Sequence, residues 1–141
     1  MENEIKLSVV IPAYNEEHRI GKTLADFDRY LSKQSYTYEI LVVNDGAKDK
    51  TADVVREAMK TINNLKLTDN KENHGKGYVV RQGMLEAKGQ YRLFSDADSS
   101  VSIDQIEKFW PYFGQGYDVV IGSIEVEGAK VEEHAAWYRR F

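Results

Sequence analysis

The segment Glu39-Ile40-Leu41-Val42-Val43 constrains the fold most, because it is a nearly continuous apolar run rich in strand-forming residues. Runs of this kind are typical of strands buried on both faces of a parallel sheet. An earlier run, Lys6 to Ile11, ends at Pro12, and proline rarely lies in a central strand. Shorter runs over 65–68, 91–94 and 117–121 complete a set of predicted strands.

Segments with apolar residues at helical spacing separate these strands. Ile20, Leu24, Phe27 and Leu31 would form one face of a first helix, which Asn15 is expected to cap. Asp49 is the expected cap of a second helix, from Thr51 to about Ile62. Further helices are expected from about 77 to 88, from a capping box at 102–105 toward 112, and over 135–141.

The alternation of strands with helices predicts an α/β fold with three layers, α/β/α, around a mostly parallel sheet. Ligands bind such sheets beyond the carboxyl ends of the strands. The loops 12–16, 44–49, 73–77 and 95–100 each follow a predicted strand. We therefore expect these four loops to meet and to form one site.

Length and composition favour one ordinary domain, spanning 1–141. Hydrophobic residues make up 42% and charged residues 30% of the chain, as in soluble globular proteins. The net charge of 19 − 23 = −4 argues against a general nucleic-acid binder. Cysteine is absent, which excludes disulfides, thiolate metal sites and a cysteine nucleophile. With no signal-peptide pattern and no membrane-length apolar run, a cytoplasmic location is expected, and any membrane contact would be peripheral.

The segment Ser95-Asp96-Ala97-Asp98-Ser99-Ser100 places two carboxylates one residue apart at the end of a strand. Like charges bunched in this way repel each other, unless a divalent cation lies between them and an anion. Oxygen ligands of this type suit Mg²⁺ or Mn²⁺, which are often shared with substrate phosphates. The alternative is a solvated aspartate turn that caps the next helix.

Three other loop residues have two interpretations each. Asp45 could accept a hydrogen bond from a uracil imide or a ribose hydroxyl, or could be a turn residue before Gly46. Lys76, in the glycine-containing loop before a helix, could bind an anion, or the loop could be a plain connection. Tyr14 could stack on a base or pack against the fold. Arg81, Arg139 and Arg140 are further candidate cations for phosphate.

Together these segments resemble the family 2 glycosyltransferases with the GT-A fold. The likeness rests on 8–17, on Val42-Val43-Asn44-Asp45-Gly46 with Asp49 and Thr51, on 73–77 and on 95–98. Within that family the chain is most similar to dolichyl- or polyprenyl-phosphate glucosyl- and mannosyltransferases, and 118–123 and 136–140 support this subgroup. The resemblance implies a Rossmann-like nucleotide-diphospho-sugar transferase fold.

The resemblance also implies a function and residue roles. The function is inverting transfer of a hexose from a nucleoside-diphosphate sugar, of the UDP-glucose or GDP-mannose type, to an acceptor such as a polyprenyl or dolichyl phosphate. Asp98 and Asp96 would bind Mg²⁺ or Mn²⁺, and no catalytic base is assigned. The residues implied to bind the nucleotide sugar are Pro12, Ala13, Tyr14, Glu16, Val43, Asp45, Lys76, Asp96 and Ala97.

The sequence departs from the family pattern in two places, and each departure affects the expected function. Ile124 stands where this subgroup usually has arginine, so Lys130, Arg139 or Arg140 replaces that charge or donor binding is weak. The family also continues past the point corresponding to Phe141, so we expect the C-terminal part to be missing and a homo-oligomer to be one way to cover the exposed edge. The alternative function is a nucleotide-sugar-binding module that is inactive without its missing half. A nucleotidyltransferase is disfavoured, because no glycine-rich loop follows the first strand.

Overall fold

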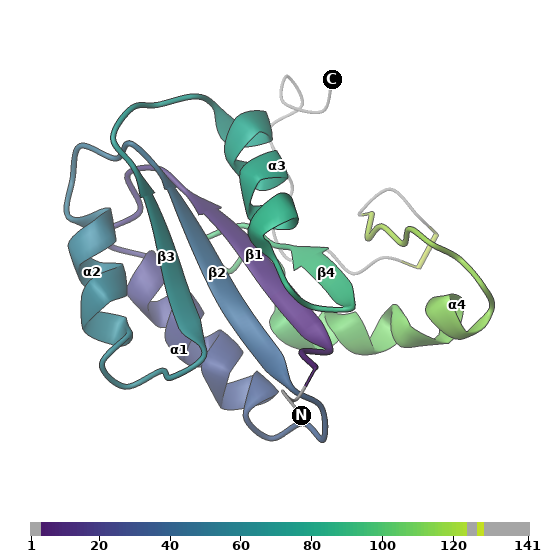
Figure 1. Ribbon diagram of the computed structural model, residues 1–141. Coiled ribbons are helices and arrows are strands. Elements are labelled where there is room, and N and C mark those ends of the chain that lie inside the picture. The colour runs from purple at the N-terminus through teal and green to yellow at the C-terminus, as the bar shows by residue number, and fades with distance from the viewer. Residues whose placement is uncertain (1–3, 124–126, 129–141) are drawn as a thin grey trace. The chain divides into compact units, whose positions relative to one another are not determined.

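The computed structural model describes residues 4–123 and 127–128. The alternation predicted from the sequence is present from the first to the fourth strand (Figure 1). The elements are β1 (Leu7–Ala13), α1 (Ile20–Leu31), β2 (Tyr38–Asp45), α2 (Thr51–Ala58), β3 (Leu65–Asn70), α3 (Lys76–Glu86), β4 (Tyr91–Phe94), the 3₁₀ helix η1 (Ile103–Lys108) and α4 (Trp110–Gly114). Among the described residues, none of the helices has both the length and the apolar character needed to cross a bilayer.

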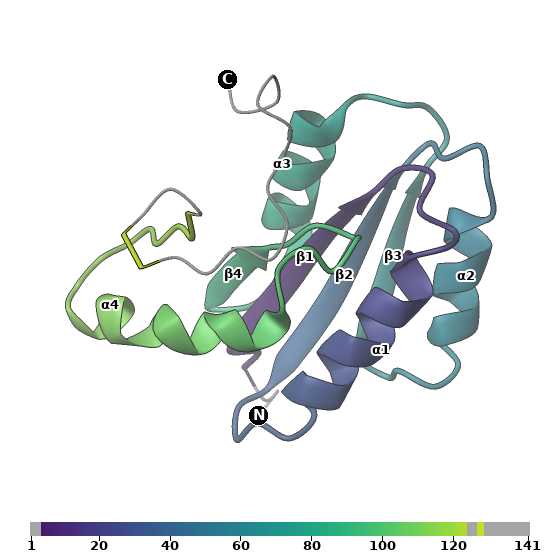
Figure 2. The ribbon, with the colours of Figure 1, turned by 180° about the vertical axis from the view of Figure 1, so that it is seen from behind.

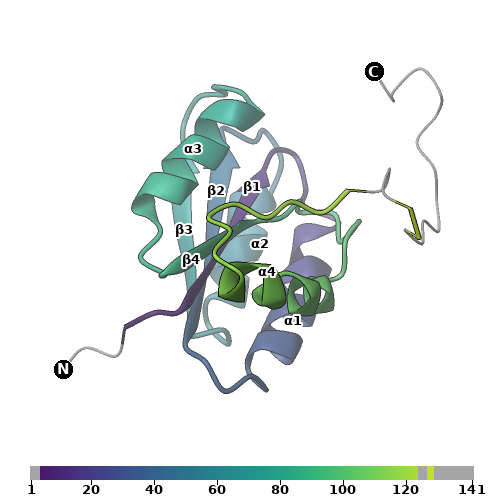
Figure 3. The ribbon, with the colours of Figure 1, turned by 90° about the vertical axis from the view of Figure 1, so that its right-hand side faces the viewer.

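The described residues fall into two compact units, which divide after Asp104. The first unit contains a four-stranded sheet in the order β3-β2-β1-β4, with every pair parallel. Helices α1 and α2 cover one face and α3 covers the other, which gives the predicted three layers (Figures 2 and 3). In the second unit, the rings of Tyr112 and Tyr117 meet edge to face with centroids 6.1 Å apart.

The core lies on both faces of β1 and β2, whose residues are buried except for the half-buried Tyr38. On one face, the apolar stripe of α1 is buried as predicted, over Ile20, Leu24, Phe27 and Leu31. On the other face, Val79 and Ala87 pack with Val10, Leu41 and Val43. The continuous apolar run of β2 therefore supplies side chains to two separate layers, as expected for a parallel strand buried on both faces.

Gly83 allows α3 to approach the sheet closely. A Cβ atom on this residue would lie 2.4 Å from Cγ1 of Val10 and 3.0 Å from Cγ2 of Val43. Only glycine lacks that atom, so the helix can lie directly against β1 and β2. This contact helps to set the position of the α3 N-terminus, where the chain carries Gly75 and Lys76.

The expectation that Pro12 ends the first strand is wrong. β1 continues through Pro12, which lies opposite Val43 of β2. On its other side, β1 pairs with β4 only over Leu7 to Val10. The Val10 carbonyl faces β4, because it accepts the Ser95 amide. Alternate residues of a strand direct their backbone groups to the same side, so the backbone nitrogen of Pro12 also faces that side. β4 has already ended there, and the N–H that proline lacks is not needed.

The expected cap of the first helix is also wrong. α1 begins at Ile20, and its N-cap, Arg19, makes no capping bond with its side chain. Asn15 instead adopts a left-handed conformation, with φ of 53°, and its Oδ1 accepts the Lys48 amide at 2.9 Å. Asparagine tolerates this conformation, so the residue joins two loops and does not start a helix.

Other differences concern the ends of elements. α2 stops at Ala58 and not near Ile62, although Asp49 does accept the Thr51 amide at 2.9 Å as a capping residue would. The predicted helix after 102 is divided into η1 and α4. The segment 117–121 is not a strand, because no described strand pairs with it. Ile124, Lys130, Arg139, Arg140 and the predicted helix at 135–141 lie outside the described residues.

Candidate functional site

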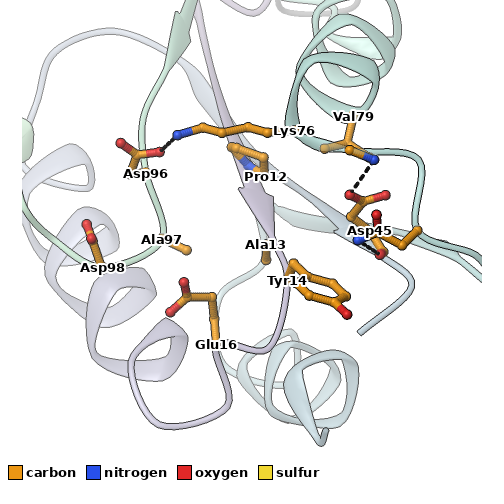
Figure 4. Close-up of a pocket in the computed structure, with 12 residues that line it drawn as sticks. Pro12, Ala13, Tyr14, Glu16, Asp45, Lys76, Val79, Asp96, Ala97 and Asp98 are labelled. Carbon is orange, nitrogen blue, oxygen red and sulfur yellow. Dashed lines mark hydrogen bonds and ion pairs between the residues drawn. The ribbon is translucent and has the colours of Figure 1, made fainter. Parts of the chain in front are cut away.

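A hollow of about 350 Å³ lies where the carboxyl ends of β1 and β2 and the segment after β4 meet (Figure 4). It brings together residues from all four loops that the sequence analysis places at one site. Figure 4 shows Asp45 on one side of the hollow and Glu16, Asp96 and Asp98 on the opposite side. The hollow is lined by Pro12, Ala13, Tyr14, Glu16, Asp45, Asn73, Gly75, Lys76, Val79, Asp96, Ala97 and Asp98.

Asp45 anchors the loop that leads into α3. Its Oδ1 accepts the His74 amide at 2.7 Å and its Oδ2 accepts the Gly75 amide at 2.9 Å, while its carbonyl accepts Nδ2 of Asn73 at 3.2 Å. Gly75 has φ of 93°, a conformation that strongly favours glycine. Each carboxylate oxygen can accept more than one hydrogen bond, so Asp45 keeps acceptor capacity while it holds the loop.

Lys76 and Asp96 form an ion pair at the hollow, with 2.6 Å between Nζ and Oδ1. Lys76 is the first residue of α3, and its ammonium also lies 5.3 Å from the centre of the Phe94 ring. The two side chains are 60% and 44% exposed, so the pair contributes little to stability. Both groups can therefore exchange partners when an anionic or cationic ligand arrives.

Asp98 carries a negative charge at neutral pH. Burial acts to raise its pKa, but the bonds from Ser100 and the charge of Arg19 outweigh that effect and hold the pKa below its ordinary value. The Ser100 amide donates to Oδ1 of Asp98 at 2.9 Å. Arg19 also binds both carboxylate oxygens of Glu16, at 2.7 and 2.9 Å.

The carboxylates suit a shared cation better than one held by protein alone. Within the described part of the chain, no group of three or more His, Cys, Asp or Glu side chains could hold a metal ion. Asp96 and Asp98 present hard carboxylate oxygens on one side of the hollow (Figure 4). Mg²⁺ and Mn²⁺ are commonly bound by one or two carboxylates, with water and substrate phosphates as the other ligands. The residues present fit that arrangement.

A partly buried hydrogen-bond network joins the loop after β1 to the loop after β2. The fully buried Thr51 accepts the Glu16 amide on its Oγ1 at 2.8 Å. Asp49 accepts the Glu17 amide at 3.1 Å and both the amide and the hydroxyl of Thr51. Burial acts to raise the pKa of Asp49, but these bonds hold it below its ordinary value. The network fixes Glu16 at the edge of the hollow.

The structure differs from the sequence-based site at a few positions. Val43 does not line the hollow and lies in the core under α3. Arg81 is exposed and is not among the lining residues, and the ring of His74 contacts that of Tyr78 at 4.5 Å. Asn73 and Gly75 belong to a loop that the sequence analysis identified, whereas Val79 was not foreseen because its apolar side chain resembles any core position.

Comparison with known proteins identifies the family. The model of Glycosyl transferase family 2 matches residues 8–137. The chain belongs to glycosyl transferase family 2. Two similar relatives are dolichyl-phosphate beta-glucosyltransferases of Trichomonas vaginalis. One is 35% identical over 97% of this chain and 45% of the relative, and the other is 42% identical over 73% of this chain and 33% of the relative.

Solved structures agree with the family assignment and with the GT-A fold. TarS of S. aureus in complex with UDP-GlcNAc has a TM-score of 0.61 and 26% identity, over 79% of this chain and 32% of that structure. A mannosyltransferase from Pyrobaculum calidifontis in complex with GDP-Man and Mn²⁺ has a TM-score of 0.58 and 28% identity, over 66% and 27%. The chain spans less than half the length of the two curated relatives described above.

Proposed function

We propose that this chain is the nucleotide-sugar-binding part of an inverting glycosyltransferase that moves a hexose to dolichyl or polyprenyl phosphate. The observation that carries the proposal is the single hollow that gathers Asp45, Lys76, Asp96 and Asp98 at the carboxyl ends of the strands. Family membership and the names of the relatives support the reaction class. Because the relatives are glucosyltransferases, glucose is favoured as the transferred sugar.

Asp45 and Tyr14 would bind the nucleoside. Asp45 is buried and already accepts two backbone amides, so its carboxylate is held in a fixed position. A fixed carboxylate is a suitable acceptor for the imide N–H of uracil or the corresponding N–H of guanine. Tyr14 is 41% exposed beside it and offers a ring face for a base or sugar.

Lys76, Asp96 and Asp98 would bind the diphosphate. On ligand binding, Lys76 would leave Asp96 and pair with a phosphate oxygen, while Asp96 and Asp98 would hold Mg²⁺ or Mn²⁺ together with the diphosphate. The cation would offset the negative charge that develops on the departing nucleoside diphosphate. Arg19 would keep Glu16 oriented at this side of the hollow, and its charge would favour the ionised form of Asp98.

A lipid phosphate is a suitable acceptor for such a site. Its oxygen is already ionised near neutral pH, so it needs no strong general base before it attacks the anomeric carbon. Attack from the face opposite the nucleoside diphosphate inverts the configuration at that carbon. An acceptor of this kind would bring the protein to the cytoplasmic face of a membrane through a peripheral contact.

The second candidate is a binding module that holds the nucleotide sugar without transferring it. This alternative rests on the same hollow, because Asp45, Lys76, Asp96 and Asp98 account for binding and no catalytic base is assigned among them. Binding would be the same in both candidates, and only turnover would differ.

The test combines binding and transfer. Thermal unfolding is followed with UDP, GDP, UDP-glucose and GDP-mannose, each with and without Mn²⁺ or Mg²⁺. A ligand present at about 100 times its Kd should stabilise the folded chain by about 2.7 kcal/mol. Transfer of labelled hexose to dolichyl phosphate supports the enzyme, binding without transfer supports the module, and no binding of any of these ligands contradicts both.

A further inference from the structure

Thr23 is a buried polar residue on α1 that contacts the loop containing the two aspartates. It is 1% exposed, and its Oγ1 lies 2.6 Å from the Ala97 carbonyl oxygen and 2.8 Å from Oγ of Ser99. Its distance to the Arg19 carbonyl, one helical turn earlier, is longer, at 3.3 Å. The main interactions of the hydroxyl are therefore with a loop 74 residues away in the sequence.

The direction of these bonds follows from the protons that each group carries. The Thr23 hydroxyl has one proton, and the Ala97 carbonyl can only accept. The short contact between them is therefore donation from Thr23 to Ala97. The Thr23 oxygen then accepts the proton of the Ser99 hydroxyl. One side chain thus acts as donor to one loop residue and as acceptor for another.

These two loop residues are the neighbours of Asp98. Ser99 adopts a left-handed conformation with φ of 57°, which is costly for a residue other than glycine and requires support from its surroundings. Ala97 is 4% exposed and lies against α1 through its carbonyl. With both flanking residues fixed, the direction in which Asp98 leaves the backbone is also fixed.

We propose that Thr23 is a positioning residue for Asp98. By bonding Ala97 and Ser99 at once, its hydroxyl holds the loop in the conformation in which Asp98 lines the hollow and accepts the Ser100 amide. The benefit to binding of a cation and diphosphate rests on the function proposed above. The anchoring itself does not depend on that function, so the two can be tested separately.

The first measurement is amide hydrogen exchange at Ser100 in the metal-free chain, because this amide donates to Asp98. Thr23→Val keeps the side-chain shape and removes the hydroxyl, whereas Thr23→Ser keeps the hydroxyl. We expect Thr23→Val to speed exchange at Ser100 about tenfold and Thr23→Ser to stay within about twofold of the parent chain. Ser99→Ala removes the hydroxyl that donates to Thr23 and should also speed exchange at Ser100. This variant replaces Thr23→Val in the experiment if Thr23→Val does not fold.

Thr37→Val is the matched control. Thr37 accepts the Lys6 amide at 3.0 Å and donates to the Glu4 carbonyl at 2.6 Å, so it makes the same kinds of bond away from the hollow. This variant should leave exchange at Ser100 unchanged. If Thr23→Val also leaves it unchanged, or if Thr23→Ser is as disruptive as Thr23→Val, the proposal is wrong.

The second measurement is the Mn²⁺ concentration that half-saturates binding of UDP or GDP. Thr23→Val should raise it about tenfold, while the affinity for the nucleotide without metal stays within about twofold. An unchanged Mn²⁺ requirement in Thr23→Val would overturn the link to cation binding. If the parent chain shows no Mn²⁺ dependence but exchange at Ser100 still responds to the hydroxyl, the proposed metal site fails and the anchoring by Thr23 stands.

Discussion

Nζ of Lys76 lies 2.6 Å from Oδ1 of Asp96. The group proposed to bind the phosphate and a group proposed to bind the cation therefore pair with each other when no ligand is bound. In the proposed complex, the Lys76 ammonium pairs with a phosphate oxygen of the ligand, and the Asp96 carboxylate binds the cation. This exchange costs little, because both side chains are well exposed. The pair offsets one carboxylate of a hollow that is also lined by the carboxylates of Glu16, Asp45 and Asp98.

Replacement of Lys76 should weaken nucleotide binding without affecting stability. Lys76→Ala removes a charge expected to pair with the diphosphate, so we expect the Kd for UDP or GDP to rise about tenfold and unfolding to change by less than about 0.5 kcal/mol. Lys22→Ala is the control, because Lys22 forms a comparable exposed pair with Asp26 on α1, also at 2.6 Å. Titration calorimetry and thermal unfolding check both values, and equal affinities in the two variants would exclude Lys76 from the site.

Asp45→Asn should impair both the fold and the site. An amide group has one acceptor oxygen, so it cannot accept the His74 and Gly75 amides on separate oxygens as the carboxylate does. We expect a loss of about 1–3 kcal/mol in unfolding free energy and a clear loss of nucleotide affinity. Asp69→Asn is the matched control, because Asp69 lies near the carboxyl end of β3, binds Asn44 and does not line the hollow. Asp69→Asn should lose stability and keep its nucleotide affinity. A larger loss of nucleotide affinity in Asp69→Asn than in Asp45→Asn would contradict the assignment of Asp45.

Gly83→Ala tests the close packing of α3. Alanine favours helices, but its Cβ would lie 2.4 Å from Val10, so we expect the variant to lose about 1–3 kcal/mol of unfolding free energy. Gly77→Ala in the same helix has no atom within 4 Å of the added carbon, and it should be neutral or more stable by up to about 1 kcal/mol. Urea unfolding of the two variants gives the comparison, and a Gly83→Ala variant at least as stable as the parent would show that α3 can shift.

Glu39 should make stability depend on pH at the end of the sheet away from the hollow. Its side chain is 4% exposed and accepts Ser8 Oγ at 2.6 Å, the Lys88 amide at 2.8 Å and Nζ of Lys66 at 2.6 Å. Burial acts to raise its pKa, but these bonds hold it below the ordinary value of 4.5. Because the folded-state pKa is the lower one, the stabilisation is fully present above that ordinary value and is lost as the pH falls through the folded-state pKa.

Glu39→Gln removes this titration. We expect the variant to be less stable than the parent by about 1–3 kcal/mol at pH 7, because a buried amide group would face the Lys66 ammonium donor, and to show a weaker loss of stability on acidification. Glu57→Gln, which changes a 73% exposed partner of Lys60, should reproduce the parent's curve. The free energy of unfolding is measured from pH 7 to pH 3 for the parent and both variants. If it falls equally with pH in the parent and in Glu39→Gln, the role of Glu39 is contradicted.

The sequence predicts the layers and the place of the site because both depend on local patterns. Alternating strands and helices determine a parallel sheet, and the loops after parallel strands must meet at one edge. The segment 117–121 shows the limit of this reasoning. Its composition is that of a strand, but a strand also needs a neighbour, and no described strand pairs with it.

Details of the site were harder to predict because they depend on contacts between distant residues. Asn15 has the composition of a helix cap, yet its bond to Lys48 belongs to another loop. Val43 lies two residues before Asp45 in β2, so both side chains lie on the face that α3 covers, but Val43 is farther from the end of the strand and packs in the core under the helix. Nothing in the sequence near Thr23 indicates that its hydroxyl contacts Ala97 and Ser99.

The most direct test of the central claim is titration calorimetry of UDP-glucose and GDP-mannose with and without Mn²⁺, on the parent chain, on Asp98→Asn and on Asp53→Asn. Asp53 is 73% exposed on α2 and serves as the control. The proposed cation-dependent site predicts that one nucleotide sugar binds the parent and Asp53→Asn more tightly with Mn²⁺, and that Asp98→Asn loses this gain. Binding with the same Mn²⁺ dependence in Asp98→Asn, or no binding of either sugar nucleotide to the parent, would contradict it.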